Sequence, residues 1–312
     1  MFKMMNNARL GVGVEGLAVT ERALQLAADY AQERVQGRAV GSPAGQPSPI
    51  VDHADVRRML LTMRSYTDAM RSLLYLNAAC LDIAARHDDP TAAQKASDRA
   101  ELLTPISKAW CTDVGCEMTS LGIQVHGGYG YIEETGAAQH FRDARISPIY
   151  EGTNGIQALD LIGRKLPMNG GQVMSDLLAD VEATIKQADQ AGPDFVAMVV
   201  GLTDALAATR EANQWIADQG TDRPNEVIAG ATPYLRMFGQ LVGGWLVVRQ
   251  ALFAQEKLAD GAGGSEDDHL ASKIVLARFY AQQLLPVVRA QLSSVTAGAS
   301  DLYAMAADGF AN

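Results

Sequence analysis

The residues best suited to chemistry lie between Gln124 and Gln157, where glycines, aromatic side chains, an Arg-Asp pair and one carboxylate are concentrated in thirty-four residues. Glu151 is the sharpest candidate, because it follows an apolar Pro-Ile-Tyr run and precedes Gly-Thr-Asn-Gly. Partial desolvation at such a turn can tune a carboxylate toward the work of a general base. An exposed acid at the start of a helix, favoured by the helix dipole, accounts for the same pattern equally well. The residues alone leave both interpretations open.

Three glycines, Gly127, Gly128 and Gly130, precede this carboxylate. One glycine is enough to end a helix, because glycine adopts left-handed conformations without penalty. Three within four positions suggest that the backbone also approaches another group closely. The pattern is not a G-x-G-x-x-G turn after a strand, so it does not indicate a dinucleotide-binding fold.

The other polar residues of this region are expected to be structural. His126 and His140 have neither a carboxylate nor a nucleophile at a telling spacing, which favours packing or surface roles. Arg142, Asp143 and Arg145 are either a solvated charge cluster or an ion pair that holds the loop before Glu151. We favour the ion pair.

Helices must position these residues. Apolar spacing predicts helices over residues 1–34, 52–86, 92–123 and 153–165, with a short helical piece at 135–142. Asp52 and Asp55 resemble an N-cap and a third-position acid for the second helix, and Pro105 allows a kink in the third. No alternating strand pattern is present. The fold class that follows is all-α, with an antiparallel four-helix bundle followed by a second helical domain.

The sequence LPMNGG at 166–171 marks the expected boundary between a first domain over 1–166 and a second over 172–312. In the second domain, helices are predicted near 172–191, 194–219, 224–259 and 266–296. The segment PYLRMFGQLVGGWLVVRQALFAQ is apolar on most faces, which predicts a central, buried helix. His269, Trp215 and Trp245 are interpreted as packing or surface residues.

Composition excludes several classes of function. The net charge is −10, from 26 basic and 36 acidic side chains, and no Lys/Arg block provides a footprint for nucleic acid. Cys80, Cys111 and Cys116 fit neither a disulfide framework nor a metal site, so we expect reduced thiols and no bound metal. No apolar run approaches the roughly 20 residues of a membrane span, and no signal peptide is recognisable. These features predict a cytoplasmic protein.

Several separated motifs resemble those of one family. The Q-x-x-G-G-x-G-Y stretch, then F-R-D-A-R, then I-Y-E-G-T-N-G-I-Q, resemble the C-terminal region of acyl-CoA dehydrogenases. The opening MNNARLGVG, the ERVQGR that ends the first helix and the helix spacing agree with this. The resemblance covers about 1–166. Residues beyond 170 resemble, by general pattern, the extra C-terminal domain of a larger subgroup that includes 3-methylmercaptopropionyl-CoA and long-chain acyl-CoA dehydrogenases.

The resemblance implies an FAD-dependent oxidation of acyl-CoA to trans-2-enoyl-CoA. Glu151 matches the family's catalytic base, which removes the proton alpha to the thioester while the beta hydride passes to FAD. Arg9 matches an arginine near bound acyl-CoA, and Tyr150 is expected to line the acyl or thioester region.

The resemblance also implies contacts with FAD. Gln124, Gly127 and Gly128 match the stretch that, in the family, contacts the adenine-dinucleotide end of FAD, often the FAD held by a neighbouring subunit. Arg34 matches an arginine that reaches the FAD pyrophosphate, and Thr153 matches a flavin-contacting position. Many relatives have a Thr-Phe-Gly run where this chain has Val-Gln-Gly, so the threonine contact to FAD is expected to be either absent or replaced by a glutamine. The implied FAD-contacting residues are Arg34, Gln36, Gln124, Gly127, Gly128 and Thr153.

Family members carry an N-terminal helical domain and a middle β domain ahead of this region, and we expect neither in this chain. We therefore expect the C-terminal half of an enzyme, as an expressed fragment, a proteolytic product or part of a split gene, with weak or no FAD binding and no turnover alone. Implied partners are an acyl-CoA substrate, an electron-transferring flavoprotein and further copies, as a dimer or dimer of dimers. The alternatives are a non-catalytic helical assembly module and a fragment of an acyl-CoA oxidase.

Overall fold

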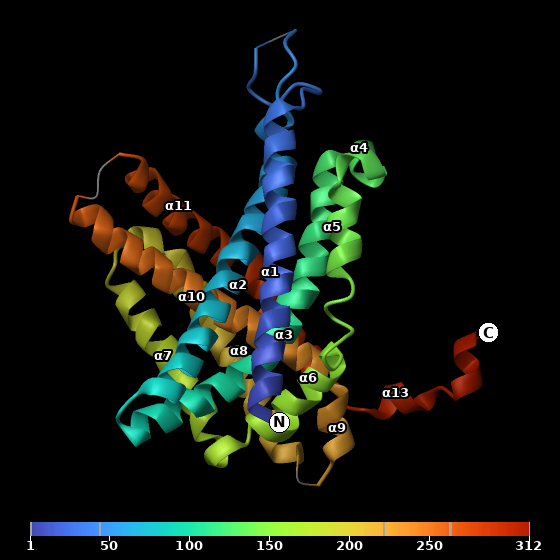
Figure 1. Ribbon diagram of the computed structural model, residues 1–312, viewed down its shortest axis with the longest axis vertical. Coiled ribbons are helices and arrows are strands. Elements are labelled where there is room, and N and C mark those ends of the chain that lie inside the picture. The colour runs from blue at the N-terminus through green and yellow to red at the C-terminus, as the bar shows by residue number, and fades with distance from the viewer. Residues whose placement is uncertain (1, 44, 221, 262–263, 312) are drawn as a thin grey trace.

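A computed structural model describes residues 2–43, 45–220, 222–261 and 264–311. Helices make up nearly all of the regular structure in these ranges, which contain no β-strand and a single isolated antiparallel bridge between Val35 and Pro49. Figure 1 shows long helices packed side by side, with α1 running along the longest axis of the molecule. The predicted all-α fold class is confirmed.

The first half is built on three long helices, α1 (Phe2–Glu33), α2 (Ala54–Arg86) and α3 (Pro90–His126). Between α1 and α2 lies a 3-10 turn, η1 (Ile50–Asp52). Apolar periodicity placed these helices to within a few residues of their ends.

The expected N-cap at Asp52 is wrong. Asp52 belongs to η1, and His53 is the N-cap of α2, without a side-chain hydrogen bond to the helix. By contrast, Asp89 caps α3 by accepting a hydrogen bond from the Thr91 amide at 2.9 Å. α3 continues through Pro105 as one helix.

Short helices follow α3 and carry the loop before Glu151. They are α4 (Gly128–Tyr131), η2 (Glu133–Thr135), α5 (Ala137–Ala144), α6 (Asn154–Asp160) and the π-turn η3 (Leu161–Lys165). The fourth member of the bundle, expected as one helix over 153–165, is therefore α6 continued by a π-turn. It is much shorter than α1, α2 or α3, and the bundle has three long helices instead of four.

The second half is also helical, and α10 lies at its centre. Its elements are η4 (Met168–Gly171), α7 (Gln172–Asp189), η5 (Pro193–Phe195), α8 (Val196–Gly220), α9 (Pro224–Ala229), α10 (Ala231–Ala259), α11 (Ser265–Phe279), η6 (Tyr280–Leu284), α12 (Pro286–Thr296), α13 (Ser300–Ala304) and η7 (Ala307–Ala311). α10 is buried over most of its length and contacts helices of both halves. The prediction of a central, buried helix at this segment is confirmed.

One continuous hydrophobic core joins the two halves. Trp110 of α3 is buried against α10 and lies edge-on to Tyr66, with ring centroids 6.1 Å apart. At Gly239 of α10, an added Cβ would lie 2.4 Å from Trp110 Cγ, so only glycine lets α10 approach this closely. The division at 166–171 stays a prediction, since the buried side chains on its two sides form a single cluster.

Partly buried ion pairs also connect the halves. Asp68 of α2 is almost completely buried and accepts a hydrogen bond at 2.6 Å from Lys273 of α11. Arg236 of α10 forms a two-bond pair with Glu117 of α3, in which Nη2 lies 2.9 Å from Oε2. These pairs hold the second half in one orientation on the first.

Within the described ranges, every helix is too short or too polar to span a membrane. The three cysteines are free thiols. Trp245 is buried and its indole N–H donates to Thr184 Oγ1 at 2.8 Å, which agrees with a packing role.

Candidate functional site

Glu151 lies at the apex of a short loop that enters α6. The backbone N–H of Asn154 donates to the Pro148 carbonyl at 3.0 Å and closes the loop. Gln157 Nε2 donates to the Gly152 carbonyl at 3.3 Å. Glu151 has φ = +56° and Gly152 has φ = +82°, so two consecutive residues are left-handed. For a glutamate this conformation is strained and needs support from its surroundings. The Glu151 carboxylate is exposed, which matches the second of the two sequence interpretations.

Asn154 fastens this loop to α3. Its Nδ2 lies 2.7 Å from Asp113 Oδ1, 3.0 Å from Thr112 Oγ1 and 3.1 Å from the Ala109 carbonyl, and its Oδ1 accepts from Lys108 Nζ at 2.7 Å. Both the donor and the acceptor group of the amide are therefore satisfied by α3. The position of the first residue of α6, and with it the Glu151 turn, is set by one face of α3.

Lys108 is completely buried, which is unusual for an ammonium group without a carboxylate hydrogen bond. Burial lowers its pKa from 10.5 to about 8, against the attraction of Asp113 and Glu151, while the positive charge of Arg9 acts in the same direction as burial. The pKa of Asp113 is raised, chiefly by burial, although its hydrogen bond from Asn154 opposes this. A weakly neutralised positive charge thus lies beneath the loop.

Residues of α1 face the same loop. The Arg9 guanidinium lies near the Gly152 backbone, with Nη2 at 3.8 Å from the position that a Cβ on Gly152 would occupy. Its Nε is buried and has no hydrogen-bond partner among the described residues. The Tyr150 hydroxyl donates to Glu15, and partial desolvation with this bond raises the pKa of Tyr150 to about 12.

Small residues bring α1 close enough to α3 for these contacts. A Cβ on Gly13 would lie 2.2 Å from the Ser107 carbonyl oxygen, and one on Gly16 would lie 2.9 Å from the Cys111 carbonyl oxygen. Only glycine fits at either position. The G-V-G-V-E-G run of α1 is therefore what places Arg9 and Lys108 on opposite sides of one loop.

Five of the six residues matched to FAD contacts, all except Thr153, lie away from the Glu151 loop, at the C-terminal ends of α1 and α3. Arg34 Nη2 donates to Gln36 Oε1 at 3.3 Å, and the Arg34 guanidinium lies 5.7 Å from the centre of the Tyr129 ring. Gly127 ends α3 with φ = +60°, after its amide donates to the Gln124 carbonyl at 3.1 Å. Nothing lies within 4 Å of a Cβ added to either Gly127 or Gly128, so this stretch of backbone is open to a ligand.

His126 supports this second group from inside. Its Nδ1 bonds to the Gly122 carbonyl at 2.7 Å, and its ring stacks on Tyr30 at 4.5 Å between centroids. It is buried, in agreement with a structural role.

The structure does not bring the two groups together. Arg9 lies on α1 and Arg34 directly follows its last residue, Glu33, and twenty-five residues of α-helix span about 38 Å. In Figure 1, the N-terminal end of α1 lies at the level of α6 and its other end lies near the level of α4. Glu151, Thr153, Arg9 and Tyr150 share one end, and the other predicted residues share the opposite end.

The ion pair expected within Arg142, Asp143 and Arg145 does not form among the described residues. Arg142 instead pairs with Glu133 through two bonds of 2.6 and 2.8 Å, and Asp143 accepts from Gln139 at 3.4 Å. Thr153 is the N-cap of α6 but makes no side-chain capping bond, which leaves its hydroxyl exposed beside Glu151.

Sequence reasoning missed Lys108, Asp113 and the side-chain role of Asn154. The available signal was Lys108 itself, the single charge in the run LLTPISKAWCT. A lone charge in the middle of an apolar helix indicates a buried polar contact, because an isolated buried ammonium is costly.

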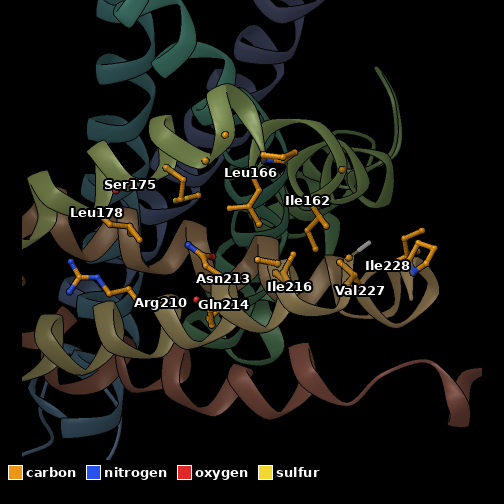
Figure 2. A pocket seen from close by; sticks show the side chains of 18 residues that line it. Ile162, Leu166, Ser175, Leu178, Arg210, Asn213, Gln214, Ile216, Val227 and Ile228 are labelled. Carbon is orange, nitrogen blue, oxygen red and sulfur yellow. The ribbon is translucent and has the colours of Figure 1, made fainter. Parts of the chain in front are cut away.

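A cavity of about 770 Å³ lies where the two halves meet, between η3, α7, α8 and α9. Figure 2 shows Arg210 at one edge of it, Asn213 and Gln214 along α8, and mostly apolar side chains elsewhere. Arg210 is paired with Glu182 at 2.7 Å, so it does not offer a free charge. The cavity lacks an acid–base group, which makes the Glu151 loop the better candidate for chemistry. Among the described residues no group of three or more His, Cys, Asp or Glu is arranged to hold a metal ion.

Comparison with known proteins identifies relatives of both halves. A family model described as "Acyl-CoA dehydrogenase, C-terminal domain" matches residues 1–166, and one described as "Acetyl-CoA dehydrogenase C-terminal like" matches residues 177–306. The 3-methylmercaptopropionyl-CoA dehydrogenase of Ruegeria pomeroyi is 42% identical over 297 residues, which are 95% of this chain and 50% of that protein.

Two solved structures share the fold. The Caenorhabditis elegans ACDH-11 in complex with C11-CoA matches with a TM-score of 0.74 at 20% identity, over 96% of this chain and 47% of that one. An acyl-CoA dehydrogenase complexed with FAD from Bacillus anthracis matches with a TM-score of 0.70 at 19% identity, over 94% and 49%. The chain spans about half the length of the curated relatives that it matches.

Proposed function

Because the chain belongs to the acyl-CoA dehydrogenase family, we propose that it forms the C-terminal half of an FAD-dependent enzyme that oxidises acyl-CoA to trans-2-enoyl-CoA. The observation that carries the proposal is the Glu151 loop. An exposed carboxylate is held in a strained, left-handed turn by hydrogen bonds to α3 and α6. Strain that the surroundings maintain in this way is typical of functional residues.

In the proposed reaction, Glu151 takes the proton alpha to the thioester carbonyl. FAD, when bound, accepts the beta hydride, so the two hydrogens leave as a proton and a hydride and a trans double bond remains. The Glu151 side chain is exposed, so a substrate can reach it without any rearrangement of this chain. Arg9 and Tyr150, which flank the loop, are the proposed contacts for the acyl-CoA.

The residues at the other end fit a dinucleotide, which is our proposal for their role. Arg34 presents a cation beside Tyr129, and the backbone of Gly127 and Gly128 is unobstructed, as the approach of a phosphate-bearing ligand requires. Gln36 and Gln124 add exposed amides. Thr153 is proposed to contact the flavin end from beside Glu151.

The separation of the two groups supports an oligomer. About 38 Å of helix lies between Arg9 and Arg34, so we propose that the adenine-dinucleotide group of one copy serves the FAD whose flavin lies at the Glu151 loop of another. A dimer or a dimer of dimers provides this arrangement. The proposed electron acceptor is an electron-transferring flavoprotein, as the resemblance implies.

The substrate is proposed from the relative that is 42% identical, whose name specifies 3-methylmercaptopropionyl-CoA. This thioester, together with straight-chain acyl-CoA of several lengths, is the panel to test first. Release of hydrogen peroxide without an added acceptor would indicate an oxidase instead of a dehydrogenase.

Replacing Glu151 with Gln in the intact, FAD-loaded protein tests the proposal. We expect the rate of acyl-CoA-dependent flavin bleaching to fall by about 10²- to 10⁴-fold, the usual contribution of a general base. The matched control is Glu134→Gln, an exposed glutamate of η2, which leaves the rate unchanged. Normal turnover in the Glu151→Gln protein would refute the assignment. For the chain of 312 residues alone, the visible spectrum is expected to show little or no bound flavin.

A further inference from the structure

Lys108 carries a buried charge that the proposed reaction does not use. Its ammonium has three donors, and the described residues offer it one hydrogen-bond acceptor, Asn154 Oδ1 at 2.7 Å. The charged groups that face it are Asp113 on its own helix, Arg9 on α1 and Glu151 on the loop. A lysine that served only to fill space would be better replaced by an apolar side chain, because burial of an ammonium is costly.

The contacts of Lys108 lead directly to the Glu151 turn. Lys108 fixes the Oδ1 side of the Asn154 amide, while α3 acceptors fix the Nδ2 side. The backbone N–H of the same asparagine closes the loop on Pro148. Rotation of the Asn154 side chain would therefore break hydrogen bonds at both the oxygen and the nitrogen of its amide, and would release the residue whose backbone N–H closes the loop.

Lys108 is the main restraint on the oxygen end of the Asn154 side-chain amide. Asn154 Oδ1 has a second contact, Thr112 Oγ1 at 3.4 Å, which is longer and involves a neutral donor. A charged donor at 2.7 Å is the stronger restraint of the two. Without it, Asp113 and the Ala109 carbonyl still bind Nδ2, but the Oδ1 end of the amide keeps only the Thr112 contact, and the start of α6 is held less firmly.

We propose that Lys108 is a positioning residue for Glu151, because its buried ammonium, acting through Asn154, fixes the start of α6 and the left-handed turn that presents the carboxylate. The inference rests on the proposed role of Glu151 as the base. It assigns to Lys108 no contact with the substrate, and it attributes the effect of Lys108 on the reaction to the orientation of the carboxylate.

The first test uses the intact, FAD-loaded protein with Lys108→Met. We expect flavin reduction at saturating acyl-CoA to slow by about 10- to 100-fold, as small misplacements of catalytic groups do. KM is expected to change by less than about threefold, because an interaction used only in the transition state is lost. The matched control is Lys165→Met, another buried lysine, which pairs with Glu101 at 2.6 Å at the far end of η3.

A double-mutant cycle separates positioning from general damage. Asn154→Ala is expected to slow flavin reduction to a similar extent, and the combination with Lys108→Met to slow it no further, because both residues act in one chain of contacts. If the double variant slowed flavin reduction by the product of the two single-variant factors, the proposal would be overturned. Unchanged flavin reduction in Lys108→Met, or an equal loss in Lys165→Met, would overturn it as well.

A second measurement applies to the 312-residue chain without FAD, and it serves where Lys108→Met fails to load the cofactor. Hydrogen exchange of the Asn154 amide, which is bonded to Pro148, is expected to accelerate by about tenfold or more in Lys108→Met, because the loop opens more often. An unchanged exchange rate would contradict the proposal. If Glu151→Gln were fully active, the function would be refuted, whereas an inactive Glu151→Gln beside a fully active Lys108→Met would refute the positioning role alone.

Discussion

The buried ammonium of Lys108 predicts an unusual dependence of stability on pH. Its pKa falls from 10.5 to about 8 in the folded chain, chiefly because it is buried. Between these two values the unfolded chain holds a proton that the folded chain does not. Protons bound only in the unfolded state make stability rise with pH, so the destabilisation caused by the Lys108 charge is full below about pH 8 and is lost as the pH rises toward 10.5.

The size of the effect follows from the same values. Each pH unit between the folded and unfolded pKa is worth about 1.4 kcal/mol, so the full range from pH 8 to 10.5 amounts to about 3 to 4 kcal/mol. Lys108→Met removes this penalty at neutral pH but also removes the hydrogen bond to Asn154, which costs about 1 kcal/mol. We therefore expect the Met variant to be more stable than the parent by about 2 kcal/mol at pH 7.

Urea unfolding of the 312-residue chain, followed by circular dichroism at several pH values, measures this difference. Subtracting the free energy of unfolding of the parent from that of the variant at each pH removes the contribution of the titrating groups that do not interact with Lys108. The difference is expected to shrink above pH 8 and to change sign as the pH approaches the lysine's ordinary pKa. A difference that stays constant from neutral to alkaline pH would show that Lys108 keeps its ordinary pKa and would refute the reasoning.

Two further changes test the loop and the contact between the halves. Glu151→Gly is expected to raise the free energy of unfolding by about 0.5 to 1 kcal/mol, because relief of a left-handed glutamate outweighs the added freedom of glycine in the unfolded chain; an unchanged or lower urea midpoint would contradict this. Asp68→Ala is expected to lower it by about 1 to 3 kcal/mol, because the partly buried ammonium of Lys273 loses its carboxylate. A loss below about 1 kcal/mol, typical of exposed pairs, would show that the pair is solvated.

The helices could be predicted from the sequence because their apolar periodicity is long and regular. α10 was recognisable as central, since a helix that is apolar on most faces has to be surrounded. The extent of the fourth bundle helix was predicted to within one residue, but its π-turn was not, because nothing local in residues 153–165 distinguishes a regular helix from one that widens at Leu161. The cap of α2 was also misjudged, since the η1 turn places His53, rather than Asp52, at the helix start.

The candidate site was only partly predictable. Glu151 could be singled out by its neighbours, but its strained φ and its attachment to α3 depend on contacts between segments some forty residues apart. The partner of Arg142 was missed because Glu133, only nine residues earlier, lies on the separate turn η2 and not at helical spacing on α5. The roles of the predicted cofactor and substrate residues stay predictions that the proposed experiments address.

α1 has a further consequence for how this chain can vary in length. It is one uninterrupted helix that carries Arg9 near one end and leads to Arg34 at the other. Inserting a single residue between them would shift one end by about 1.5 Å and rotate it by about 100° about the helix axis. The helical phase of α1 therefore couples the two groups of residues, and insertions are tolerable in the exposed stretch after Gln36 but not within α1.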